Sequence, residues 1–91
     1  MIEIGYIGSQ ELQTSEANKE IIPSKPDDWT HGYKLYKFSF MNESDCTVVI
    51  NDKYTIFLKA NQGLSIDKGD EPIVSFKIKE GGIKYNFIGA F

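Results

Sequence analysis

Hydrophobic and polar residues alternate along most of the C-terminal half of the chain, most regularly between residues 73 and 91. Alternation with a period of two residues indicates strands that bury one face. Two such runs are separated by Glu80-Gly81-Gly82, and glycine adopts the positive φ angles of tight hairpin turns without a steric penalty. We therefore predict a β-hairpin that pairs Phe76 with Phe87, because this register places the large apolar side chains on one face.

The same pattern predicts further strands, each bounded by turn-forming residues. They lie at residues 2–6, 33–40, 46–50, 54–58 and 64–66. A loop at residues 51–53 pairs Val48 with Ile56, so that the apolar faces of the two strands around it agree. Turn formers gather at residues 42–45, 61–63 and 67–72.

Residues 8–32 lack this alternation. Between Gln10 and Glu20 only Leu12 and Ala17 are apolar, which is too few for the apolar stripe of a packed helix. We predict a loop there, with at most one helical turn. The two prolines that follow exclude regular structure. Loops of this length in compact domains are usually functional or disordered.

About seven short strands at regular spacing, without a helical apolar stripe, are typical of an antiparallel all-β domain. A sheet that is apolar on one face needs a second layer to cover it, and no helix is available for this. We therefore predict one β-sandwich domain over residues 1–91, jelly-roll-like in form, with a long irregular loop at about residues 8–32. A small β-barrel is the alternative. No α-helix longer than about two turns is expected.

The charge composition argues against nucleic-acid binding. The net charge is −3, and all ten basic residues are lysines. Arginine, the preferred binder of phosphate and guanine, is absent, so we expect no nucleic-acid partner and no acidic membrane surface. The N-terminal residues lack the basic and apolar regions of a signal peptide, and no apolar run reaches the ~20 residues of a membrane span. We expect the chain to be made in a cytoplasm and to stay soluble there.

Catalytic and metal-binding patterns are missing from the sequence. Cys46 is the only cysteine, which excludes an intramolecular disulfide, and its place on an apolar strand face predicts a buried side chain. His31 is the only histidine and has no nucleophile or orienting carboxylate at a recognisable spacing. The acidic turn at residues 67–71 lacks the ligand spacing of a calcium loop. We expect no enzyme activity, no metal ion and no cofactor.

Trp29, His31 and Tyr33 alternate at the end of the long loop, beside two aspartates. Aromatic faces combined with carboxylates are common in surfaces that hold sugar rings or partner side chains, which makes these three residues a candidate ligand site. In the other interpretation, Trp29 covers the open end of the sandwich as part of the core. We favour the second interpretation, since a domain this small rarely leaves its only tryptophan exposed.

Three segments carry patterns of a known family. They read FSFMNESDCTVVIN at residues 38–51, IFLKANQG at residues 56–63 and IKYNFIGAF at residues 83–91. They contain an I-N turn, an I-F-x-x-A-x-x-G strand and a terminal Y-x-x-I-G-A-aromatic pattern. In these patterns, over about residues 36–91, the chain resembles small β-sandwich structural proteins of tailed bacteriophages of Gram-positive hosts.

The resemblance implies a virion- or tail-associated β-sandwich that is present in several copies and carries no catalytic residues. Its partners would be further copies of itself and other virion proteins, and it would pass from the host cytoplasm into the virion. Residues 1–32 are left unassigned by the resemblance. Two alternatives stay open: a module that binds a carbohydrate or small ligand, and a phage protein that binds a host protein.

The chain ends in apolar residues without a polar tail. Alternation places Ile88 on the face opposite Tyr85 and Phe87. An outward apolar side chain close to an apolar chain end forms a patch that a second copy can cover. We predict that Ile88 and Phe91 lie at a subunit contact.

Overall fold

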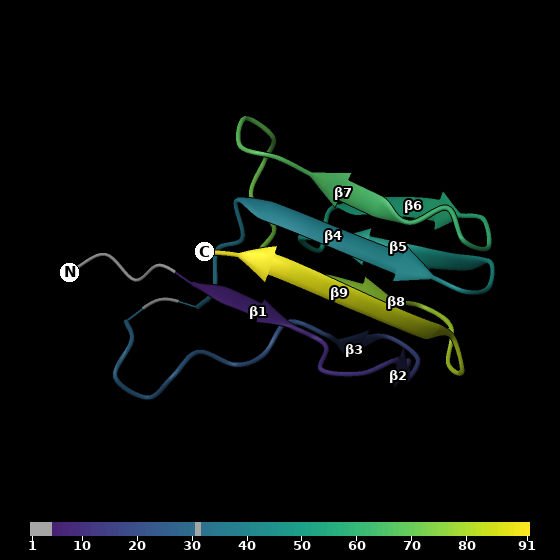
Figure 1. The fold of residues 1–91 in the computed structure, drawn as a ribbon, viewed down its shortest axis with the longest axis horizontal. Coiled ribbons are helices and arrows are strands. Elements are labelled where there is room, and N and C mark those ends of the chain that lie inside the picture. Colours follow the sequence, from purple (N-terminus) through teal and green to yellow (C-terminus); the bar gives the residue numbers. More distant parts are fainter. Residues whose placement is uncertain (1–4, 31) are drawn as a thin grey trace.

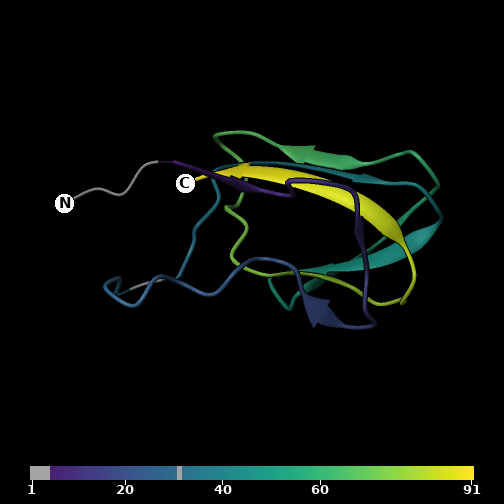
Figure 2. The same ribbon diagram turned by 60° about the horizontal axis from the view of Figure 1, so that its bottom comes forward.

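The computed structural model describes residues 5–30 and 32–91, and within them nine strands form two antiparallel sheets. The first sheet has the order β1 (Tyr6–Gly8), β9 (Lys84–Ala90), β4 (Lys37–Asn42) and β7 (Leu64–Ile66), with β2 (Gln13–Thr14) also paired to β9. The second sheet has the order β3 (Lys19–Glu20), β8 (Phe76–Ile78), β5 (Cys46–Ile50) and β6 (Tyr54–Leu58). The sheets lie one behind the other in Figure 1 and form two separate layers in Figure 2. The prediction of an all-β antiparallel sandwich is confirmed.

The core lies between the two layers. Phe38 and Phe40 of β4 point into it and meet Phe76 of β8, with ring centroids 5.0 and 4.8 Å from the Phe76 centroid. Alternate residues of β5 are buried in the same way, and Cys46 is one of them. Burial is the main cause that raises the pKa of the Cys46 thiol, so this residue acts as a small hydrophobic side chain. The predicted burial of Cys46 is confirmed.

The hairpin predicted for residues 46–58 is also confirmed. Cys46 lies opposite Leu58 and Val48 opposite Ile56, the pairing that brings the apolar faces together. Asn51 and Asp52 in the turn both have a φ of 55°, in the left-handed region that Asn and Asp tolerate better than other side chains. The strands and their turn are contiguous in the sequence, so local pattern alone determines this register.

The hairpin predicted for residues 73–91 is wrong. β8 and β9 belong to different sheets, and residues 79–83 cross from one layer to the other. Phe87 lies opposite Phe40 in the register of β4 and β9, whereas Phe76 packs against Phe40 across the core. β9 forms six register pairs with β4. The apolar faces of β8 and β9 are buried equally well whether the strands lie side by side in one sheet or face each other across two layers. Alternation therefore identified the buried faces of β8 and β9 but not their partner strands, and before β8 it failed, because Val74 is exposed and Ser75 is buried.

Ser15 holds the crossing between the layers in place. Its buried hydroxyl donates to the Glu80 carbonyl at 2.7 Å and accepts from the Ile83 amide at 2.9 Å. Its own amide donates to the Ile83 carbonyl at 2.7 Å, and its carbonyl accepts from the Gly82 amide at 2.8 Å. These bonds satisfy the backbone of a segment that leaves one sheet before it joins the other.

The segment around Ser15 corrects the prediction of an irregular loop over residues 8–32. It contains β2 and β3, which pair with β9 and β8 respectively. Each has two residues with largely polar side chains, so no apolar alternation marks them in the sequence. The proline-containing stretch that follows forms no strand up to residue 30, as predicted. The described residues contain no helix, hence none long and apolar enough to cross a membrane.

The strand predicted at residues 33–40 begins later than expected and is interrupted at its start. Leu35 is buried and exchanges backbone hydrogen bonds of 2.9 Å with Ile73, which leads into the second sheet. The amide of Tyr36 instead donates to Ala90 of the first sheet, and the Tyr36 side chain is exposed. The chain thus changes its partner sheet between these two residues, which shifts the buried face before β4 begins.

Candidate functional site

Trp29, Tyr33 and Phe91 form an aromatic cluster at the end of the sandwich where β9 finishes. The three rings contact one another edge to face, with centroid distances of 5.0 Å for Trp29–Tyr33, 5.4 Å for Trp29–Phe91 and 4.9 Å for Tyr33–Phe91. Phe91 is held there by two backbone hydrogen bonds with Gly5, of 2.9 and 3.0 Å. Tyr33 and Phe91 also pack against the core, so the cluster extends the core toward the chain end.

This geometry places Trp29 at the margin of the core, in contact with Tyr33 and Phe91, which themselves pack against it. The structure brings Trp29 and Tyr33 together as the sequence suggested, but their rings contact each other and Phe91, and both are partly buried. His31, the third residue of the predicted ligand site, lies outside the described residues. Within residues 5–30 and 32–91, no group of three or more His, Cys, Asp or Glu side chains is placed to hold a metal ion.

Trp29→Ala is expected to lower the free energy of unfolding by about 2 kcal/mol, because two edge-to-face contacts and part of the ring's burial are lost. Thermal unfolding followed by circular dichroism measures this, with Tyr36→Ala as a matched control at an exposed aromatic residue. A glycan array should show no binding for either the wild type or Trp29→Ala. Unchanged stability together with glycan binding that only the wild type shows would instead establish a ligand site.

The two residues predicted at a subunit contact are separated by the fold. Phe91 is partly buried in the aromatic cluster of its own chain. Ile88 points outward from β9, and 53% of its surface is exposed. Of the two residues predicted at the contact, Ile88 is therefore the one exposed to a partner.

Ile88 borders a shallow depression of about 200 Å³ on the outer face of the first sheet. Its lining includes Tyr6 of β1, Ile88 and Ala90 of β9, Lys37 and Ser39 of β4, and Ser65 of β7. Ile88 lies between Gly8 and Ser39 in the register of the sheet, so it rises above small neighbours. We call this depression and its lining the outer-face patch.

The outer-face patch combines exposed apolar surface with little charge. Tyr6 is 78% exposed. This is unusual for an aromatic ring, whose large apolar area is normally buried. Lys37 is the one charged residue of the lining, and its ammonium lies 3.8 Å from the Asp67 carboxylate. Exposed apolar residues gathered in this way mark contact surfaces more often than single scattered ones do.

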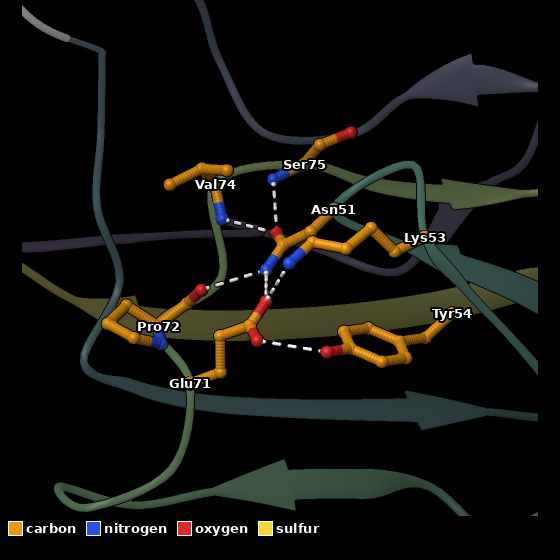
Figure 3. A network of polar contacts seen from close by, with 7 residues as sticks. All are labelled: Asn51, Lys53, Tyr54, Glu71, Pro72, Val74 and Ser75. Atoms are coloured by element: carbon orange, nitrogen blue, oxygen red, sulfur yellow. Dashed lines mark hydrogen bonds and ion pairs between the residues drawn. The ribbon is translucent and has the colours of Figure 1, made fainter.

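A polar network around Asn51, which sequence reasoning did not identify, ties the β5–β6 turn to the segment before β8 (Figure 3). The Asn51 side-chain oxygen accepts hydrogen bonds from the Val74 and Ser75 amides, and its nitrogen donates to Pro72 and Glu71. The sequence indicated only that Asn51 favours a turn, because its partners lie 20 to 24 residues away.

Glu71 is bound within this network and not free in the acidic turn. Asn51 donates to one of its carboxylate oxygens and the Tyr54 hydroxyl to the other, at 2.9 and 3.0 Å, and the Lys53 ammonium lies 3.4 Å away. The bonds from Asn51 and Tyr54 hold the pKa of Glu71 below its ordinary value, and Lys53 adds to this effect. The network therefore ties Glu71 of the acidic turn to the β5–β6 hairpin.

Comparison of the chain with protein-family models, with curated proteins and with solved structures gives no match.

Proposed function

We propose that the protein is a non-enzymatic structural or assembly component of a tailed bacteriophage particle, and that it acts by protein–protein contact. Its partners are further copies of itself and other virion proteins, and it joins the virion after synthesis in the host cytoplasm. The phage setting is supported by the resemblance of residues 38–51, 56–63 and 83–91 to small phage structural proteins. The contact role is supported by the structure of the outer-face patch.

The observation that carries the contact role is the exposure of Tyr6 and Ile88 on one continuous sheet face. Tyr6 lies on β1, which pairs directly with β9, the strand of Ile88, so backbone hydrogen bonds fix their relative positions. The row through Ile88 continues with Gly8, Ser39 and Ser65, whose small side chains leave room for an approaching surface. A rigid, neutral and apolar face of this kind loses little conformational entropy when it is covered.

The outer-face patch is suited to a second copy of the same chain. In a two-fold contact the same surface meets itself, so it must offer both a protruding group and a space beside it. Ile88 protrudes, and the depression that it borders supplies the space. Because Lys37 is already close to Asp67, two such faces meet without an uncompensated pair of like charges at their centre.

Ile88→Asp is expected to lower the mass of the protein in solution, because it places a charge at the centre of an apolar contact. Size-exclusion chromatography with light scattering measures the mass. Circular dichroism should show an intact fold, since Ile88 points away from the core. Val74→Asp is the matched control, because Val74 is 50% exposed but lies outside the outer-face patch. An unchanged mass for Ile88→Asp with an intact fold would contradict the proposed contact.

A further inference from the structure

β6 forms an unprotected edge of the second sheet. It is the last strand in the order β3-β8-β5-β6, and among the described residues it pairs with β5 alone. Natural edge strands are usually short, or are protected from further pairing by charged residues, proline or a bulge. β6 has five residues, Tyr-Thr-Ile-Phe-Leu, with neither charge nor proline. Uncharged segments of high β-propensity are the ones that readily pair with another strand.

The backbone groups that point out from this edge belong to Thr55 and Phe57. On β5, the Thr47 carbonyl accepts from the Lys79 amide, so Thr47 and its alternate neighbours face β8. Val48 and Ile50 therefore face β6, and their register partners there turn their backbone groups toward β5. The residues between those partners turn theirs outward, which leaves Thr55 and Phe57 free to pair with a further strand.

The apolar interior of the sandwich is also open along β6. Tyr54, Ile56 and Leu58 lie on the core side of the sheet, because their register partners on β5 are buried. Leu58 is buried, but Ile56 and Tyr54 remain 36% and 45% exposed. β7, the edge strand of the first sheet, lies on the same side in Figure 1, and its Leu64 and Ile66 are only partly buried. The core is thus incompletely covered on this side.

We propose that β6 pairs antiparallel with β6 of a second copy across a two-fold axis, which joins the second sheets of two chains into one continuous sheet. The proposal deepens the proposed function, on whose assembly role it rests, by assigning a second contact and its partner. A strand is always complementary to its own copy in an antiparallel pair, and β6 brings no like charges together. The same approach covers the open core along Ile56 with an identical apolar surface.

The residues next to β6 indicate where the axis lies. An axis at Ile56 would set Lys53 opposite Lys59 of the copy, and like charges directly opposite each other destabilise a strand pair. An axis at Phe57 avoids this and places Lys59 opposite Thr55. Because the Lys59 amide and carbonyl are already bonded to Gln62 and Asn42 of their own chain, the backbone hydrogen bonds between the two copies centre on Phe57. This axis also sets Phe57, which is 57% exposed, against its copy. Contact between two phenyl rings adds to the area that the pairing buries.

The test separates this contact from the outer-face patch by using Ile88→Asp as the starting protein. Light scattering is expected to give twice the chain mass for Ile88→Asp and a monomer for Ile88→Asp with Phe57→Lys. Ile88→Asp with Val74→Lys is the matched control and should remain dimeric. A monomer for Ile88→Asp alone would overturn the β6 contact. A wild-type dimer that survives Ile88→Asp and is lost in Phe57→Lys alone would contradict the outer-face patch but support the β6 contact.

Amide hydrogen exchange gives a second readout that is specific to strand pairing. In the β6-paired dimer, the amide of residue 57 should exchange slowly at high protein concentration and rapidly after dilution or in Phe57→Lys. Thr55→Pro should have the same effect on mass as Phe57→Lys, because its ring projects from the edge toward the second copy and removes no bond to β5. If Thr55→Pro fails to fold by circular dichroism, Phe57→Lys decides the outcome. Rapid exchange of the Phe57 amide in a dimeric protein would overturn the proposal.

Discussion

Phe76→Ala should lower the free energy of unfolding by about 3–5 kcal/mol, whereas Phe87→Ala should cost clearly less. Phe76 is fully buried and contacts both Phe38 and Phe40 across the core. Phe87 is only partly buried, and its ring contacts Phe38 at a centroid distance of 5.9 Å. Since small domains have about 5–15 kcal/mol of stability in total, Phe76→Ala threatens folding itself.

Urea denaturation followed by tryptophan fluorescence and circular dichroism measures both losses. Phe76→Leu serves as the control, because it keeps most of the apolar volume and should recover much of the loss. Equal losses for Phe76→Ala and Phe87→Ala would mean that both rings are equally buried. Such a result would favour the hairpin suggested by the sequence over two strands in separate layers.

Asn42→Ala should cost about 3 kcal/mol, which is unusual for a polar residue at the end of a strand. Asn42 is fully buried, and its side-chain nitrogen donates at 2.9 Å to the carbonyls of both Ser44 and Lys59. Its side-chain oxygen accepts from the Gly63 amide, also at 2.9 Å. Alanine would leave the Ser44 carbonyl and the Gly63 amide without this partner, while the Lys59 carbonyl keeps its bond from the Gln62 amide. Each buried unsatisfied group costs roughly 1–3 kcal/mol unless water replaces the bond.

Asn86→Ala is the matched control for this prediction. Asn86 is exposed on β9 and faces solvent, so its replacement should change stability by less than about 0.5 kcal/mol. Chemical denaturation of both variants gives the comparison. If Asn42→Ala were as mild as Asn86→Ala, the Asn42 network would not be what connects the end of β4 to the loop between β6 and β7.

Strand pairing was predictable from the sequence where two strands that are neighbours along the chain also pair with each other. The β5–β6 hairpin followed from alternation on either side of a short turn, and the turn residues Asn51 and Asp52 have the backbone geometry that such a turn needs. The final hairpin was not predictable in the same way. Phe76 and Phe87 belong to strands that have apolar faces in either arrangement, so the pattern is equally compatible with one sheet or two.

The candidate surfaces show the same division. Alternation alone placed Ile88 on the outward face of its strand, and the structure shows it there. The contact of Phe91 with Trp29 and Tyr33 joins residues about 60 positions apart in the sequence, and local pattern carries no information about it. The edge position of β6 also depends on the order of strands in the sheet, which the spacing of the strands does not reveal.

The sequence by itself determined which residues form the strands of the C-terminal half, which faces of them are apolar, and that a second sheet must cover the first. Only the tertiary structure decided which strands pair, where β2 and β3 close the sandwich, and which polar side chains are buried. The physical reason is that alternation records the environment of each side chain, while strand pairing depends on backbone hydrogen bonds that any sequence can make. Side chains such as Ser15 and Asn42 select among the pairings, because they bond to segments far along the chain.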